Sequence, residues 1–283
     1  MIQQMIVNGL LAGLIYVIMA LGFSLIFGIM KTVNFAHGEF YMVGAVVVLT
    51  LFGQYGVNFF VAVIVGGVVS AVLGMLLERV LVRAVVTNET AGMMMTMAIG
   101  IILQSSALLF FGPAEQTIPR PFSGTWALFG AVVPWDRTFV SGCSLVILVL
   151  FYFYMKYSRL GLAMQAVAQD PATASLMGIE SGLVYSAAFG LACLLAGLAG
   201  GLMAPVYTIG PYMGTMPMLK AFVVVTLGGL GSLPGAFLGG MLIGLSESVL
   251  STLMDATAAL IASFVIVLLV VLTKPTGLMG RRV

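Results

Sequence analysis

Long apolar runs fill most of this chain, and short polar segments separate them. Within each run the apolar residues are continuous rather than alternating, so the runs predict helices and not the strands of a membrane barrel. A helix of about 20 apolar residues is long enough to cross the hydrocarbon core of a bilayer. We therefore predict transmembrane helices at residues 5–30, 57–77, 91–112, 138–157, 183–207 and 256–273.

One further run, residues 220–253, is as apolar as the others but is broken in its middle. The part before the break would make a helix of only about 16 Å, roughly half the thickness of the bilayer core. Inside lipid, the backbone leaves helical geometry only where protein or a water-filled cavity satisfies it. The break therefore predicts either a translocation pathway or an ordinary tight helical hairpin. Its candidate pathway residues are Gly228, Gly229, Ser232 and Pro234.

A second interruption, residues 31–39, joins the first long run to a short apolar run. Its candidate pathway residues are Asn34, His37 and Glu39. For His37 we prefer a structural role, in which the ring donates to a nearby backbone carbonyl group, over contact with a solute. A long helix, a break and a short apolar run recur at 183–253, and this echo predicts an internal repeat around a central site.

Composition supports a membrane protein. Hydrophobic residues make up 61% of the 283 residues and charged residues 7%, and the mean hydropathy is +1.20. Soluble domains carry about 25% charged residues, so this chain has too few polar residues to cover a soluble surface. We predict an all-α, polytopic transmembrane helical bundle of about eight to ten helices with Gly/Pro-broken half-helices. The net charge of +2 gives no reason to expect a nucleic-acid partner.

The sequence offers no catalytic pattern. It contains no Gly-Lys dipeptide and hence no phosphate-binding loop of the nucleotide hydrolases. One histidine and two cysteines, both in apolar runs, predict neither a metal site nor a disulfide. We therefore expect a protein that is not an enzyme, with no catalytic residue, metal or cofactor. Of the acids deepest in apolar sequence, Glu39 and Glu247, the second either takes part in function or bridges helices near the outer end. Small residues at four-residue spacing, such as Gly9 and Gly13, predict close helix packing.

Basic residues orient the helices through the positive-inside rule. Their distribution places residues 158–182 and the C-terminal tail in the cytoplasm and makes 113–137 an external loop. With about nine crossings the N-terminus lies outside, and Lys220 lies near the outer surface.

The cytoplasmic segment 158–182 contains two short amphipathic pieces, separated at Asp170 and Pro171 and ended at Gly178. Two short helices lying on this surface are suited to dock another protein. The alternative is a helical loop that merely packs on its own domain.

Three motifs occur in order along the chain. They are Val33-Asn-Phe-Ala-His-Gly-Glu-Phe-Tyr-Met-Val-Gly-Ala45, the segment from Gly161 to Ile179 with its Ala-x-Ala-x-Asp-Pro core, and Lys220-Ala-Phe followed by Gly228-Gly-Leu-Gly-Ser-Leu-Pro-Gly-Ala236. Together they resemble the permease subunits of ABC importers in the branched-chain amino-acid family. The similarity, together with the order of the spans, covers nearly the whole chain. It implies a type II-like permease with a single transmembrane domain over residues 1–283.

The resemblance also implies partners and a location. The chain would pair with a homologous second permease, most simply as a heterodimer, and with two cytoplasmic ABC ATPase subunits that bind the ATP. An extracytoplasmic substrate-binding protein would deliver the solute, and the assembly would lie in the lipid bilayer of a bacterial cell (inner) membrane as a multi-pass complex. Segment 158–182 would be the coupling helix that enters an ATPase groove. Its coupling residues would be Gln165, Ala166, Asp170, Leu176, Gly178 and Ile179, although the family usually has an arginine and then an acid where this chain has Gln165 and Gln169.

These expectations converge on one function, a subunit that forms half of the translocation pathway of an ATP-driven amino-acid importer. Branched-chain amino acids (leucine, isoleucine and valine) are the leading solutes, while urea, short amides and aromatic acids stay open. The rival is a stand-alone channel or facilitator for a small polar solute such as urea or an amide. A channel has no need of a cytoplasmic docking helix, so segment 158–182 separates the two hypotheses.

Overall fold

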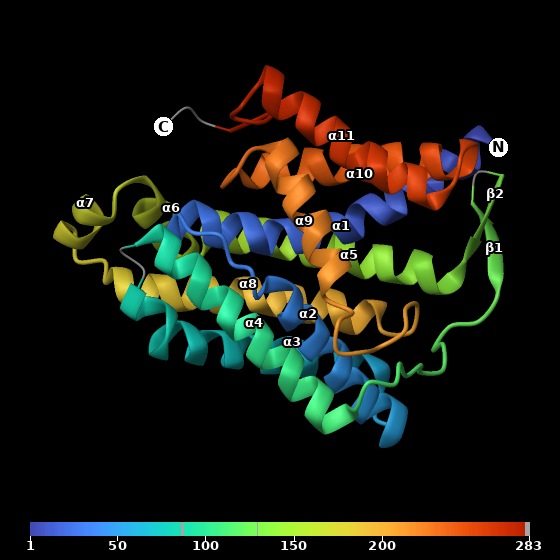
Figure 1. Ribbon diagram of the computed structural model, residues 1–283, viewed down its shortest axis with the longest axis horizontal. Helices are drawn as coiled ribbons and strands as arrows, with labels where there is room; N and C mark the ends of the chain where they lie inside the picture. Colours follow the sequence, from blue (N-terminus) through green and yellow to red (C-terminus); the bar gives the residue numbers. More distant parts are fainter. Residues whose placement is uncertain (86–87, 129, 281–283) are drawn as a thin grey trace.

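The computed structural model of the protein describes residues 1–85, 88–128 and 130–280. Most of the described chain is helical (Figure 1). Within these ranges seven helices are long and apolar enough to cross a membrane, which confirms a multi-pass helical bundle. They are α1 (Ile2–Met30), α3 (Phe59–Val80), α4 (Glu89–Phe111), α5 (Trp135–Tyr157), α8 (Ser181–Met203), α10 (Leu233–Leu253) and α11 (Ala256–Thr273).

Shorter helices complete the chain. Helix α2 (His37–Val48) follows α1 and continues into a π-helical turn, η1 (Leu49–Gln54), while α9 (Thr215–Gly228) follows α8. A 3₁₀ turn, η2 (Val82–Val85), follows α3, and α6 (Arg159–Gln169) and α7 (Pro171–Leu176) lie between α5 and α8. The seven long helices together with α2 and α9 agree with the expected size of the bundle.

Most of the long helices run lengthwise, so the molecule has two distinct ends (Figure 1). The N-terminus lies at one end, whereas α6 and α7 lie at the opposite end, toward which α11 also runs. The basic residues of the sequence assign the first end to the outside and the second to the cytoplasm. We call them the outer end and the α7 end.

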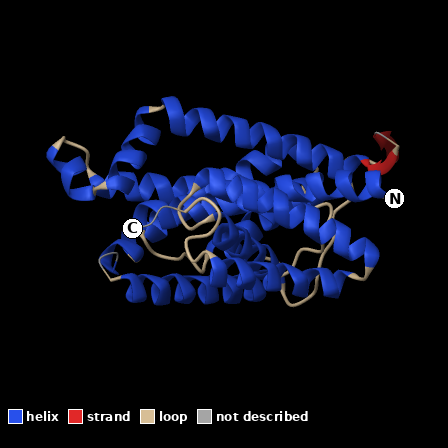
Figure 2. Cartoon of the chain, turned by 90° about the horizontal axis from the view of Figure 1, so that it is seen from above, coloured by secondary structure: helices blue, strands red, loops and turns tan. Residues whose placement is uncertain are grey.

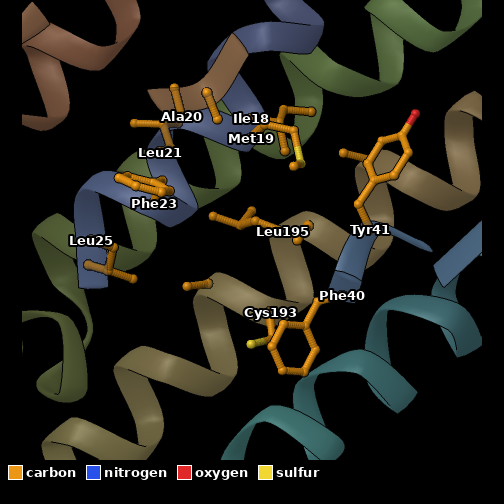
Figure 3. Packing of buried hydrophobic residues seen from close by; sticks show 14 of the residues in the cluster. Ile18, Met19, Ala20, Leu21, Phe23, Leu25, Phe40, Tyr41, Cys193 and Leu195 are labelled. Atoms are coloured by element: carbon orange, nitrogen blue, oxygen red, sulfur yellow. The ribbon is translucent and has the colours of Figure 1, made fainter. Parts of the chain in front are cut away.

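Helix α1 forms the centre of the bundle. Its most apolar stretch is 61% buried, compared with 17% for the peripheral α11, and it packs against α8, α9 and α10. Figure 3 shows part of the core around it, to which α1 contributes Phe23 and in which Phe40 of α2 lies beside Cys193 of α8. The core is therefore built around the first interrupted helix pair rather than around the outer spans.

Side-chain caps fix where several helices begin. Asn58 opens α3, Asn88 opens α4 and Asp255 opens α11, and each side-chain oxygen accepts a hydrogen bond from a backbone N–H group two or three residues later. The first N–H groups of a helix have no partner inside the helix, so a cap of this kind stabilises the start. These polar residues explain why the chain reverses between long apolar runs.

Glycines let the central helices approach closely. A Cβ built on Gly44 of α2 would collide with the carbonyl group of Gly197 in α8, and one built on Gly244 of α10 would lie 2.5 Å from the backbone of Gly13 in α1. Small residues at such contacts allow close packing of membrane helices. The packing role predicted for glycines at four-residue spacing such as Gly13 is confirmed, and Gly44 is a further position of this kind.

Replacing Gly44 by alanine is expected to destabilise the protein by about 1–3 kcal/mol, because the added Cβ meets backbone that can move only with its helix. Thermal unfolding of the detergent-purified protein measures the effect. Gly142→Ala is the matched control, since the Cβ position of Gly142 on α5 faces open space. Equal melting temperatures for the two variants would contradict the packing role of Gly44.

The predicted external loop at 113–137 contains a small structure that the sequence analysis missed. Strands β1 (Thr125–Leu128) and β2 (Ala131–Pro134) pair antiparallel and lie near the N-terminus (Figure 2). The side chain of Gln4 in α1 donates to the carbonyl oxygen of Val132 at 2.8 Å and accepts from its N–H group at 2.9 Å. The side chain of Gln4 thus attaches this two-stranded sheet to the first turn of α1. The loop has no local strand pattern that would have predicted the sheet.

Candidate functional site

The first break lies between α1 and α2. Helix α1 ends at Lys31, whose φ of 55° is left-handed. The side-chain oxygen of Asn34 accepts a hydrogen bond from the N–H group of Ala36 at 3.0 Å, which shapes the turn into α2. As predicted, the His37 ring bonds to backbone, with its Nε2 3.1 Å from the carbonyl oxygen of Met19. The break is a defined turn buried inside the bundle.

Helix α4 supports this turn from the other side. The Thr96 hydroxyl lies between the N–H group of Phe35, which donates to it at 3.1 Å, and the carbonyl oxygen of Val33 at 3.3 Å. One turn of α2 further on, the side chain of Gln104 donates to Glu39 Oε1 at 2.7 Å. Thr96 therefore holds the non-helical backbone that lipid would not tolerate, and Gln104 holds a side chain in the first turn of α2.

The three candidate residues of this break each keep a polar atom without a partner among the described residues. These atoms are Asn34 Nδ2, His37 Nδ1 and Glu39 Oε2, and all are buried. A buried polar atom without a hydrogen bond is costly, so such atoms usually meet water or a polar ligand. The structure thus brings Asn34, His37 and Glu39 to one buried turn that can offer hydrogen bonds to a solute.

The second short helix begins against the first. Gly38 lies in the first turn of α2, and Gly214 is the residue before the first turn of α9. A Cβ built on either glycine would collide with the carbonyl group of the other. Each short helix follows a long one, α1 or α8, after a non-helical link. The predicted repeat is therefore visible as two interrupted helix pairs whose short helices meet at their N-termini. Helix N-termini carry partial positive charge, and such ends recur at the substrate sites of transporters.

The other predicted break residues lie elsewhere. Gly228, Gly229, Ser232 and Pro234 form the turn from α9 into α10, at the far end of α9 from Gly38, and a helix of this length separates its ends by about 20 Å. The structure does not bring them together with the Asn34 turn. They form instead a second tight junction.

The turn after α9 is satisfied by protein. The N–H groups of Leu278 and Met279 donate to the carbonyl oxygens of Leu227 and Gly228 at 2.9 and 2.8 Å. A Cβ built on Gly28, near the end of α1, would lie 3.3 Å from the carbonyl oxygen of Gly231. Ser232 caps α10 through its hydroxyl. Of the two readings, the geometry of this turn favours the tight hairpin.

The predicted coupling segment folds as α6 and α7, at the end of the bundle opposite the N-terminus (Figure 1). Asp170 caps α7 by accepting hydrogen bonds from the side chain and N–H group of Thr173 and from the N–H group of Ala172. These bonds lower the pKa of Asp170, the Thr173 hydroxyl contributing most. The capped helix holds the loop in one shape.

Residues at the tip of α7 are strongly exposed. Leu176 is 88% exposed and Met177 79%, although both are apolar. Gly178 has a φ of 83°, and the N–H group of Ile179 returns to the carbonyl oxygen of Ala174 at 3.1 Å. We call Leu176 and Met177 the α7 tip. Two large apolar side chains are thus exposed side by side in sequence at the α7 end of the molecule.

The remaining predicted coupling residues are less prominent. Gln165 is exposed, and its side chain donates to the carbonyl oxygen of Met155 in α5, while Ala166 is half-buried against the core. The bond of Gln165 attaches α6 to α5. Ile179 is likewise half-buried, below the exposed tip.

Two charged clusters hold no residue of the predicted site, although Glu247 was predicted to take part in function or to bridge helices near the outer end, and it does bridge helices. Lys220, Glu247 and Tyr16 join α9, α10 and α1, and Glu78 and Arg83 join α3 to α8. The sequence did contain a signal for both clusters, because each cluster pairs an isolated cation with an isolated anion that lies in or beside an apolar run. Sequence alone could not show which charges meet.

A multi-pass bundle with two interrupted helix pairs that meet inside it is typical of membrane transport proteins. Residues 5–273 match the family described as the permease component of branched-chain amino acid transport systems, and the chain belongs to that family.

Relatives match over nearly the full length. The chain is 34% identical to the high-affinity branched-chain amino acid transport system permease protein LivH of Escherichia coli (strain K12), with 99% of this chain and 96% of that protein covered. It is 30% identical to the permease protein BraD of Pseudomonas aeruginosa, over 98% of this chain and 95% of BraD. It is 25% identical to the permease protein LivM of E. coli (strain K12), over 94% of this chain and 68% of LivM.

Proposed function

We propose that this chain forms half of the translocation pathway of an ATP-driven importer of branched-chain amino acids. Membership of the permease family supports the transport role. The names of the relatives, which specify high-affinity branched-chain amino acid transport, support the solute class. The observation that carries the ATP-driven part is the α7 tip, because Leu176 and Met177 expose apolar surface that a partner protein would cover.

The proposed assembly contains a second permease and two ATPase subunits. The chain is similar both to LivH and, more distantly, to LivM, which supports a pair of homologous permeases in one transporter. ATP would bind to separate subunits, because this chain has no phosphate-binding loop. A substrate-binding protein would dock at the outer end, on the loop that carries β1 and β2.

In the proposed cycle, nucleotide binding draws the ATPase subunits together and displaces the α7 tip. The movement reaches α5 and α8, which flank the coupling segment, and through α8 the interrupted helix pairs. Their meeting N-termini and the unpartnered atoms of Asn34 and Glu39 then offer hydrogen bonds to the passing solute. Weak contacts of this kind permit rapid release, and the binding protein supplies most of the specificity.

Co-purification tests this proposal. The tagged chain, extracted gently from its native membrane, is expected to bring with it two ABC ATPase subunits and a second permease. The same preparation in liposomes is expected to accumulate leucine only with ATP and the binding protein. A homo-oligomer that conducts urea or an amide without ATP would overturn the proposal in favour of a channel. ATP-dependent uptake of another solute class would overturn only the choice of substrate.

A further inference from the structure

A cavity of about 590 Å³ opens at the outer half of the bundle. Its walls come from α1, α9, α10 and the start of α11, together with the link between α8 and α9. This volume falls within the range of about 300–1,000 Å³ that is usual for small-molecule sites. It lies beside the outer part of α9 and is separate from the tight turn at Gly228.

Both a cation and an anion face this cavity. Lys220 Nζ donates to Glu247 Oε1 at 2.6 Å and to the Tyr16 hydroxyl at 2.6 Å, and that hydroxyl donates to Glu247 Oε2 at 2.8 Å. The side chains of Lys220 and Glu247 are 23% and 20% exposed, so they are sheltered but reachable. We call Tyr16, Lys220 and Glu247 the charged triad.

A second cation lies in the cavity wall. Arg137, at the start of α5, lines the cavity and is exposed. The neighbouring Asp136 pairs with Arg120 at 3.4 Å instead, and no ion pair within the described ranges engages the Arg137 guanidinium group. The first turn of α9, which has no side-chain cap, also borders the cavity. Its positive end adds to the attraction for an anionic group.

The rest of the wall is mostly aliphatic. A ligand that entered would meet hydrocarbon on several sides and charge on one. The apolar lining residues include Leu11, Ile15, Met203, Val206, Met213 and Leu260.

We propose that this cavity is a transit site for the free zwitterionic amino acid, an inference that rests on the proposed function. Glu247 receives the α-ammonium group, Lys220 and Arg137 receive the α-carboxylate, and the aliphatic wall receives a branched side chain. In the empty site Lys220 and Glu247 neutralise each other, so neither of these two sheltered charges is left unpaired, while Arg137 is exposed. An entering zwitterion brings one charge of each sign and exchanges partners with the pair, so no net charge is buried.

The alternative is that the charged triad only bridges α1, α9 and α10. Protection of a reporter cysteine by bound ligand distinguishes this alternative from a transit site. The experiment uses the complete transporter in liposomes, with Ser251→Cys in the cavity wall as the reporter. Cys143→Ala removes the other partly accessible cysteine of this chain, and Cys193 is buried. A small thiol reagent labels the reporter, and mass spectrometry follows the rate. The competing ligands are leucine, 4-methylpentanoate, which lacks the ammonium group, and 3-methylbutylamine, which lacks the carboxylate.

Leucine is expected to slow labelling more than either analogue does. Glu247→Gln should raise the half-protecting concentration of leucine and of 3-methylbutylamine about tenfold and should not raise that of 4-methylpentanoate, because Lys220 then has no competing carboxylate. Lys220→Gln should raise the half-protecting concentrations of leucine and 4-methylpentanoate and should not raise that of 3-methylbutylamine. Melting temperatures identify any variant that fails to fold, in which case the comparison of the three ligands on the parent protein decides.

Two results would overturn the inference. One is the absence of protection by leucine in a preparation that takes up leucine with ATP, which would leave the proposed function standing. The other is that neither Glu247→Gln nor Lys220→Gln changes the concentration dependence of protection. The charged triad would then only bridge helices. Failure of ATP-driven leucine uptake itself would instead refute the proposed function.

Discussion

Replacing Arg83 with alanine is expected to lower the free energy of unfolding by about 3 kcal/mol, because the change leaves a buried carboxylate without its cation. Glu78 is fully buried near the end of α3, and Arg83 reaches both of its oxygens at 3.3 and 3.2 Å. Removing one partner of a buried ion pair usually costs about 3–5 kcal/mol. We take the lower end of this range because the Arg83 side chain is 34% exposed. Thermal unfolding in detergent should show the loss as a melting temperature several degrees lower.

Arg83 does more than neutralise Glu78. Its guanidinium group also donates to the carbonyl oxygen of Gly182 and to the hydroxyl of Ser186, both at 2.6 Å, and Ser186 donates in turn to Glu78. Gly182 and Ser186 lie in the first turns of α8, where the chain leaves the coupling segment. The pair therefore attaches α3 to the helix through which movement of α7 would enter the bundle.

A double variant provides the control. Glu78→Met combined with Arg83→Met removes both charges and keeps much of the volume, so its melting temperature should lie nearer the parent's than that of Arg83→Ala does. Lys31→Ala, which removes a cation that joins no ion pair in the described part of the chain, should change stability little. If Arg83→Ala melts like Lys31→Ala, the pair contributes nothing and the attachment of α3 to α8 must come from apolar packing.

Hydrophobic runs predicted the long helices well because each span in lipid has to satisfy its backbone N–H and C=O groups by hydrogen bonds within its own helix. The predicted run at 91–112 became α4 at Glu89–Phe111, and that at 256–273 became α11 with the same limits. The motif around Asn34 also predicted a real break. In these places the local sequence and the membrane environment favour the same secondary structure.

Long-range pairing escaped prediction for a physical reason. The glycines at 228 and 229 look like a mid-membrane break, but the tail residues Leu278 and Met279 satisfy that turn from 50 residues away in sequence, as their backbone hydrogen bonds show. The true counterpart of the Asn34 turn is the opening of α9 at Gly214, which no polar motif marks. Likewise Lys220 and Glu247 each looked like an isolated charge until the fold paired them.

Replacing both Leu176 and Met177 with serine is expected to abolish ATP-driven uptake while leaving the permease folded. The two side chains make few contacts within this chain, as their exposure shows, so their loss removes little of the protein's own packing. An apolar side chain that becomes buried at an interface contributes about 1.5–3 kcal/mol. Losing two should weaken ATPase association about a hundredfold or more.

Recovery of ATPase subunits with the tagged permease measures the association, and leucine uptake into liposomes measures its consequence. Leu176→Met combined with Met177→Leu exchanges two apolar side chains and should restore both readouts. Leu162→Ser is the matched control, because Leu162 is an exposed leucine of α6, away from the α7 tip. Normal ATPase recovery and uptake in the double serine variant would show that α7 is not the coupling element, and the exposed tip would then need another partner.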